Sequence, residues 1–249
     1  MSDSRIASLP PSATVGDWVA NYPETAEVFD MLQIDYCCDG TKPLENACWE
    51  NGLEVIRVHS LLKHTVAQAG NKHETDWMHA SLTKLCDEIE HTHHKLLKET
   101  LPLLSDMMAE VVSLHGESHE SLHEVQQHFM NWRDDILGVM AEEERSLFPA
   151  IRELEAGGKP DACLRASLNK MIHRIQFNHE DIGKALKNAR TASENFKAPC
   201  DACPKFAQMY GLLRWIENDV RHHVHKEESI LFPRVRQSLN HAIGVNPGE

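Results

Sequence analysis

The stretch HVHKEESILFP, residues 223–233, places a histidine and a glutamate four positions apart within a helical pattern. Apolar residues recur around it at intervals of three and four, the spacing that keeps side chains on one face of a helix. This stripe runs through Met209, Leu213, Ile216, Val220, His223, Glu227 and Ile230. His223 and Glu227 are therefore predicted to face the core.

A second copy of the motif lies 84 positions earlier, where EERSLFPAI at 143–151 matches EESILFPRV at 227–235. A repeat at fixed spacing indicates two related helical hairpins that together form one antiparallel four-helix bundle. Glu143 corresponds to Glu227 under this alignment, but Val139 stands where the second copy has His223.

Four long helical segments are predicted after residue 75 and two shorter ones before it. Their ranges are 76–114, 118–155, 161–193 and 204–239 in the first group, and 15–31 and 52–68 in the second. Gly70 and Asn71 mark the expected boundary. The prediction is an all-α chain with a small helical domain at 1–70 and the four-helix bundle at 71–249.

Two further polar side chains fall on apolar stripes. Glu143 and His179 each interrupt a run of core positions on the second and third long segments. On the first segment, one stripe includes His93 and a neighbouring one includes His94, and periodicity alone does not choose between them. Pro102 is placed to kink this segment and rotate its face.

Buried carboxylates require protonation, a positive partner or a metal, because an unpaired charge in the core costs several kcal/mol. No lysine or arginine falls on these stripes. A single inward histidine is more often a hydrogen-bonded core residue. Two glutamates and several histidines on different helices instead favour a metal centre, and mixed nitrogen and oxygen ligands suit iron or manganese.

The charge balance argues against several partners. Thirty-eight acidic and 25 basic residues give a formal net charge of −13, which favours neither a nucleic acid nor an anionic membrane surface. The sequence contains no apolar run long enough to cross a bilayer, and its N-terminus lacks a signal-peptide pattern. We therefore expect a cytoplasmic protein whose seven cysteines are reduced.

Together these motifs resemble a known family. H-x3-E followed by LFP, the copy EERSLFP, and His179 in FNHEDIG look like the hemerythrin-like HHE bundle. IDYCCDG at 34–40 looks like the small domain that precedes this bundle in the repair-of-iron-centres proteins of the ScdA and YtfE type.

This resemblance implies a non-haem centre of two iron ions with an oxo or hydroxo bridge. Its implied function is iron donation to damaged iron–sulfur proteins during nitrosative or oxidative stress, which does not require steady enzymatic turnover. Oxygen or nitric oxide is the implied small ligand, and a homodimer through the small domain is compatible with the family.

The resemblance also implies a ligand set. The family places a histidine eight residues before a Leu-Pro proline, which selects His94, and a further histidine that falls at His115. The implied iron ligands are His94, Glu143, His179, His223 and Glu227, with both glutamates bridging.

The departure from the family is Val139, because valine binds no metal. The consequence is an open coordination position, a substitute ligand such as Asp135 or Glu142, or the loss of one site. Asp135 is the preferred substitute because it precedes Val139 by one helical turn.

The cysteines carry weaker signals. Cys37 and Cys38 are predicted to occupy a turn, where they would hold iron in transit, react with a nitrosylated centre, or serve only structure or redox sensing. Cys200 and Cys203 form a single C-x2-C, a spacing found in zinc sites and redox pairs. Without a second pair or suitably spaced histidines, an oxidisable loop pair is the favoured interpretation.

Three rival functions stay open. The first is a sensor or carrier of oxygen, nitric oxide or iron that has no repair activity. The second is a di-iron oxidase or peroxidase, which predicts steady turnover. The third is a metal-free helical scaffold, which predicts that a chelator leaves thermal stability unchanged.

Overall fold

The computed structural model describes residues 9–37, 39–69, 76–157 and 160–241, and within these ranges it contains helices and no strand. The predicted all-α fold is confirmed. The elements are α1 (Val15–Asn21), a 3-10 turn (Pro23–Thr25), α2 (Ala26–Met31), α3 (Leu44–Glu50), α4 (Val55–Ala69), α5 (Leu82–Glu88), η2 (Ile89–His94), α6 (Lys95–His115), α7 (Ser121–Glu142), η3 (Glu143–Leu147), α8 (Phe148–Glu155), α9 (Ala162–Ala192), α10 (Pro204–His225), η4 (Lys226–Leu231) and α11 (Phe232–His241).

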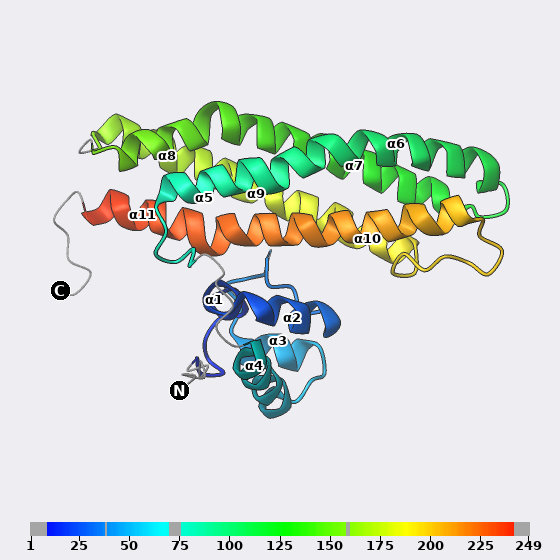
Figure 1. The fold of residues 1–249 in the computed structure, drawn as a ribbon, viewed down its shortest axis with the longest axis horizontal. Coiled ribbons are helices and arrows are strands. Elements are labelled where there is room, and N and C mark those ends of the chain that lie inside the picture. The colour runs from blue at the N-terminus through cyan, green and yellow to red at the C-terminus, as the bar shows by residue number, and fades with distance from the viewer. Residues whose placement is uncertain (1–8, 38, 70–75, 158–159, 242–249) are drawn as a thin grey trace. The chain divides into compact units, whose positions relative to one another are not determined.

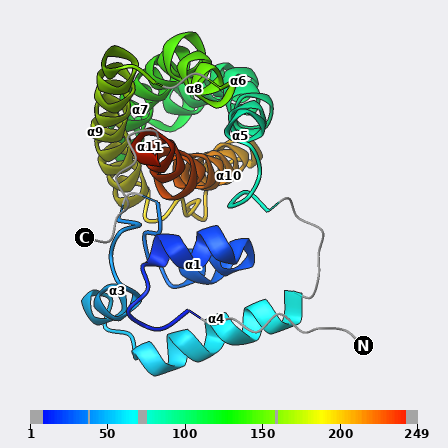
Figure 2. The same ribbon diagram turned by 90° about the vertical axis from the view of Figure 1, so that its left-hand side faces the viewer.

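Four long rods form the bundle (Figures 1 and 2). They are α5–η2–α6, α7–η3–α8, the single helix α9, and α10–η4–α11. The view in Figure 2 looks along these rods. The four long segments predicted from the sequence correspond to these rods, but three of the rods change from α to π geometry part-way along, which periodicity did not predict.

The predicted stripes of the second, third and fourth rods lie in the bundle core. On α9 every position of the stripe is buried, namely Leu168, Ile172, Ile175, His179, Ile182, Leu186 and Ala189. Burying an aliphatic side chain contributes roughly 1.5–3 kcal/mol, so these stripes supply most of the driving force for packing. Asp161 begins α9 by accepting a hydrogen bond from the Leu164 backbone N–H at 2.7 Å.

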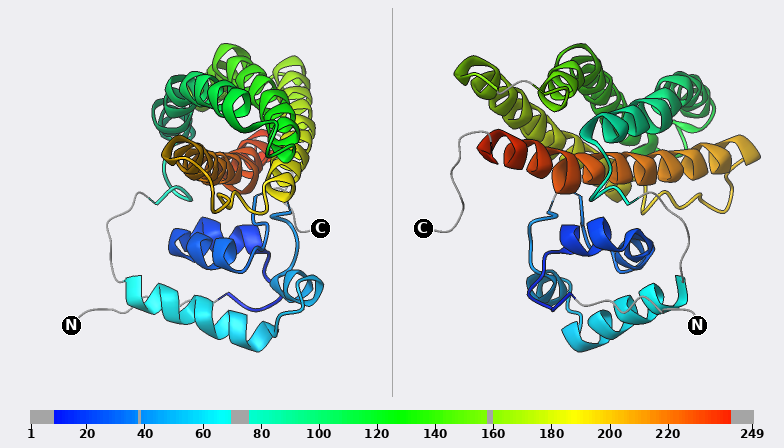
Figure 3. Two further views of the ribbon diagram at one scale, coloured as in Figure 1. Left: turned by 90° about the vertical axis from the view of Figure 1, so that its right-hand side faces the viewer. Right: turned by 60° about the vertical axis from the view of Figure 1, so that its left-hand side comes forward.

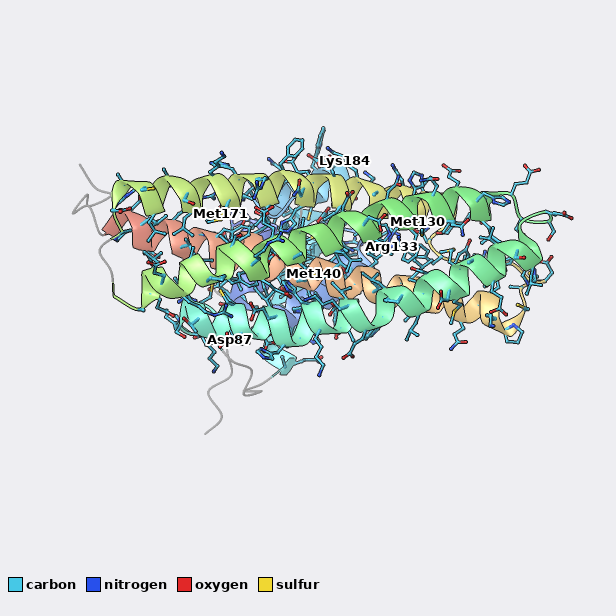
Figure 4. The ribbon with its side chains drawn as sticks, turned by 90° about the horizontal axis from the view of Figure 1, so that it is seen from above. Asp87, Met130, Arg133, Met140, Met171 and Lys184 are labelled. Carbon is cyan, nitrogen blue, oxygen red and sulfur yellow. The ribbon has the colours of Figure 1, made fainter. Side chains whose placement is uncertain are left out.

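Polar contacts at the edges of the bundle fix neighbouring rods. Arg133 on α7 donates to Ser105 Oγ on α6 at 3.0 Å, and Figure 4 shows this arginine on the face where α7 runs beside α6. Arg152 on α8 donates to Asp87 at 2.6 Å and to Glu90 at 2.9 Å. The second contact ties α8 to the segment that carries the candidate ligands of the first rod.

The chain divides into two compact units, Met1–Leu85 with Val224–Ser238, and Cys86–His223 with Leu239–Glu249. The first unit contains the short helices α1 to α4, drawn in blue to cyan in Figure 3. Arg234 belongs to this unit and donates to the Trp77 carbonyl at 2.8 Å. The predicted domain boundary at residue 70 stays a prediction.

Short helices of the N-terminal segment depend on local caps and a close backbone approach. Thr14 and Asp17 form a capping box at the start of α1, each side chain accepting from the other residue's backbone N–H. A Cβ at Gly16 would lie 2.7 Å from the Gly40 carbonyl oxygen, so this contact requires glycine.

None of the described helices is long and apolar enough to cross a membrane.

Candidate metal centre

Three π-helical segments place the candidate ligands. His94 is the last residue of η2, Glu143 is the first of η3, and Glu227 is the second of η4. A π-turn contains an extra residue and is frequent at functional sites, because it turns side chains that a regular helix would direct elsewhere. Pro149 and Pro233 follow two of these segments. Proline lacks an N–H and clashes with the carbonyl four residues earlier, so it disfavours the α-helical register there.

Four buried side chains converge. His94, Glu143, His223 and Glu227 are each fully buried, and one ligand atom from each lies within 4.8 Å of the others. His223 and Glu227 lie one turn apart on a continuous helix, which brings both to the same face.

The spacing of the two imidazoles suits a shared ion. The Nε2 atoms of His94 and His223 are 3.1 Å apart. With metal–nitrogen bonds of about 2.0–2.1 Å, two imidazoles on one ion are separated by roughly 2.9–3.4 Å.

His94 is held by a carboxylate outside this group. Its Nδ1 lies 2.8 Å from Glu144 Oε1, and Lys98 Nζ lies 2.6 Å from the same oxygen. Burial raises the pKa of Glu144, but the hydrogen bonds from Lys98 and His94 outweigh it and hold that pKa below its usual range. An ionised carboxylate only accepts hydrogen bonds, so Nδ1 carries the proton of a neutral His94 ring and Nε2 presents its lone pair to the group.

His93 has a different role from His94. It is also buried, so both histidines left open by periodicity lie inside the bundle. Its Nδ1 lies 2.8 Å from Asp219 Oδ1, and its ring stacks on His223 with centroids 5.6 Å apart and planes inclined by 8°. Only His94 belongs to the four-residue group, while His93 packs against and orients His223.

Glu143 faces histidines from two different helices. Its Oε2 lies 3.4 Å from His94 Nε2, and its Oε1 lies 4.0 Å from His179 Nε2 on α9. His179 is 2% exposed and lies outside the four-residue group, beside its Glu143 edge. One carboxylate oxygen of Glu143 thus lies toward each of two imidazoles.

Neither predicted substitute for the missing histidine, Asp135 or Glu142, belongs to the four-residue group. Val139 is buried, whereas Asp135 is exposed on α7. At about 100° per residue, Asp135 is turned roughly 80° from Glu143 around the helix, so the one-turn spacing from Val139 does not carry it inward. Glu142 is half-buried and pairs with Arg174.

The remaining predicted residues lie elsewhere. His115 contacts Cys203, with Nε2 and Sγ 3.2 Å apart, at the opposite end of α6 from His94. Cys37 is buried, and its thiol donates to Asp35 Oδ1 at 3.1 Å. Cys38 lies outside the described residues. Cys200 and Cys203 are free thiols, exposed and half-buried respectively.

Sequence reasoning missed Glu144, His93 as a supporting group, and Asp219. Glu144 and Asp219 do not lie on an apolar stripe, so a search for polar residues within such stripes does not select them. The signal that was available is chemical: a ligand histidine needs an acceptor for its second nitrogen, and an acidic residue beside a ligand motif is a candidate for it.

The donor set fits a metal ion. Among the described residues, the buried ionisable side chains that the fold places among the candidate ligands are histidines and glutamates, and neither lysine nor arginine is buried. Two buried carboxylates without a buried basic side chain favour a divalent cation as the compensating charge. Imidazole nitrogen with carboxylate oxygen suits iron among the common metals.

The bundle and this donor set define a class of protein, the hemerythrin HHE cation binding domain. The model of that family matches residues 85–235, more than half of the chain, and the chain belongs to it. A second family model, the ScdA_N domain of unknown function, matches residues 11–66.

The chain is also similar to several named proteins along most of its length. It is 28% identical over 224 residues to the iron–sulfur cluster repair protein ScdA of Staphylococcus epidermidis, covering 89% of this chain and 96% of that protein. It is 25% identical over 220 residues to the iron–sulfur cluster repair protein YtfE of Enterobacter sp. (strain 638), covering 88% and 94%. A probable iron–sulfur cluster repair protein of Haemophilus influenzae is 25% identical over 221 residues. The predicted resemblance to the repair-of-iron-centres proteins is confirmed.

Proposed function

We propose that this chain is a non-haem di-iron protein that repairs damaged iron–sulfur clusters by supplying iron. The observation that carries the proposal is the position of Glu143, whose two oxygens face His94 and His179 from separate helices. A carboxylate placed in this way serves two ions better than one.

The proposed ligands come from all four rods of the bundle. His94 and His223 would hold one iron, His179 would hold the other, and Glu143 and Glu227 would be shared between them. Bound iron supplies the ion that a damaged cluster lacks, together with an attachment point for oxygen or nitric oxide. The protein's own groups orient the ligands: Glu144 fixes the His94 tautomer, and Asp219 with His93 fixes the His223 ring.

Val139 makes the two proposed iron sites unequal. The iron held by His179 lacks the imidazole that the second half of the bundle provides through His223, so it is the more weakly bound of the two. Because a donor has to release its ion, an unequal pair suits donation better than two equally tight sites do.

A repair role is favoured over sensing by what accompanies the bundle. The relatives named as repair proteins match across both the N-terminal segment and the bundle. Damaged iron–sulfur proteins of the cytoplasm under nitrosative or oxidative stress are the proposed targets. A homodimer and an iron carrier through Cys37 and Cys38 belong to the same proposal.

Reactivation of a cluster enzyme tests the function. A purified [4Fe–4S] dehydratase inactivated by nitric oxide is incubated anaerobically with the iron-loaded protein, with the Glu227→Ala variant, or with an iron salt matched to the protein's iron content. We expect reactivation by the loaded protein to exceed that by the salt and by the variant. Equal recovery in all three would reject repair and leave the sensor as the better description.

A further inference from the structure

Two histidines and two cysteines lie at the other end of the bundle from the four-residue group. α6 has 21 residues, so at 1.5 Å per residue its two ends are roughly 30 Å apart. His115 ends α6, and His119 follows in the turn to α7. The connection from α9 to α10 reaches the same end, as Figure 1 shows, and contains Cys200 and Cys203.

Two contacts join the histidines to this connection. His115 Nε2 lies 3.2 Å from Cys203 Sγ, and His119 Nε2 lies 3.2 Å from Asp201 Oδ2. Both imidazoles pack against the ring of Phe206, with centroids 5.5 and 5.6 Å away. That packing directs two Nε2 atoms toward one three-residue stretch of chain.

The spacing of these residues matches a zinc ligand set. His115 and His119 form H-x3-H, while Cys200 and Cys203 form C-x2-C. Structural zinc ions are bound by two cysteines and two histidines with these separations, in tetrahedral geometry. A single C-x2-C is weak evidence, but the fold brings the matching histidine pair to it across more than eighty residues of sequence.

One distance, between His115 and Cys203, agrees with this chemistry. Bonds of about 2.3 Å to sulfur and 2.0–2.1 Å to nitrogen place a thiolate and an imidazole on one tetrahedral zinc about 3.5 Å apart. The observed separation between His115 and Cys203 is 3.2 Å, within a small side-chain adjustment of that value.

We propose that His115, His119, Cys200 and Cys203 form a zinc site that fastens the α6–α7 turn to the α9–α10 connection. Cys200 is exposed, so its side chain is free to rotate onto the ion, and the His119–Asp201 contact gives way to His119–zinc. This assignment takes His115 away from the iron centre, where the family resemblance had placed it. The site is independent of the proposed repair function.

Sulfur ligation makes the site measurable apart from the iron centre. The buried group of histidines and glutamates contains no cysteine, so a thiolate-to-cobalt charge-transfer band in protein loaded with Co²⁺ reports only on cysteine ligands. The full chain, purified under reducing conditions, is titrated with Co²⁺ and then with Zn²⁺. We expect the band to develop with one equivalent of Co²⁺ and to disappear as one equivalent of Zn²⁺ displaces it.

Cysteine variants identify the thiolates that produce the charge-transfer band. Cys200→Ser/Cys203→Ser should abolish it and lower bound zinc by one equivalent while leaving bound iron unchanged. Cys37→Ser/Cys38→Ser and Cys163→Ser should retain it, the latter changing an exposed cysteine of α9. No band in the wild type, or a band lost in the Cys37/Cys38 variant instead, would overturn the site. So would a Cys200–Cys203 disulfide that forms in air despite added zinc.

Discussion

The two halves of the bundle carry the same motif but different ligands. EERSLFP and EESILFP both contain a glutamate that enters a π-segment and a proline that follows it, and both glutamates are fully buried. Four residues before the glutamate, however, the first half has Val139 and the second has His223. Both halves thus share the π-segment and the proline, whereas only the second half has the imidazole.

This difference separates what shapes the site from what binds in it. Both glutamates are fully buried whether valine or histidine stands four positions earlier, so the inward carboxylate does not depend on the imidazole. Val139 is buried with the apolar core, so the first half uses that position for packing instead of coordination. We infer that the bundle tolerates valine at this position because apolar packing, and not the imidazole, holds the architecture there.

The largest expected effect comes from removing a shared carboxylate. Glu227→Ala should weaken iron binding at least about tenfold, equivalent to ~1.4 kcal/mol or more of binding free energy. If both glutamates bridge, Glu143→Ala should do the same despite the unequal halves. Iron per chain is measured after anaerobic purification.

The neighbouring Glu228 supplies the control for that experiment, because it is half-buried and lies outside the four-residue group. Glu228→Ala should retain wild-type iron. Normal iron content in the Glu227 variant would reject the ligand assignment.

Loss of the group that orients His94 should have a smaller effect. Glu144→Gln keeps the shape of the side chain but removes the charge that holds the Nδ1 proton, and partners of this kind typically contribute 10- to 100-fold to metal affinity. We expect iron affinity to fall by about tenfold in a competition with a chelator. Glu153→Gln on α8 is the surface control, and equal effects of the two substitutions would remove Glu144 from the site.

Sequence alone predicted the bundle and most of the group, for a physical reason. Core-facing positions repeat with the helical period, so His223, Glu227, Glu143 and His179 were visible as polar residues within apolar stripes. The choice between His93 and His94 was not available from periodicity, because η2 changes the period at that point. The contact of His115 with Cys203 was hidden for another reason: it joins residues 88 positions apart, and no local pattern encodes their meeting.

Introducing the missing histidine at position 139 should strengthen iron binding. Val139→His places an imidazole where the repeat predicts one, so the first half acquires the ligand that the second half has. We expect iron to be lost to a chelator several-fold more slowly, and the second equivalent to bind more tightly. If donation depends on the weaker site, the same variant should reactivate a damaged cluster more slowly.

Val139→Leu separates coordination from packing in that experiment, because it enlarges the same buried position without adding a ligand. It should release iron at the wild-type rate. If the histidine variant also releases iron at the wild-type rate while folding normally, the asymmetry between the halves has no bearing on the metal.

The smallest expected effect concerns the two prolines. Pro149→Ala and Pro233→Ala restore an N–H and remove a ring clash, which favours a return from π to α geometry and turns the preceding glutamate away from the group. Iron retention should fall a few-fold while the thermal stability of the metal-free protein stays the same or rises.

The Pro233 variant should lose more iron than the Pro149 variant, because the helix before Pro233 carries both His223 and Glu227, and the helix before Pro149 carries Glu143 alone. Chelator-challenge rates and circular dichroism melting curves for the two variants decide the matter. Equal retention in both would mean that core packing, and not proline, holds the π-segments in place.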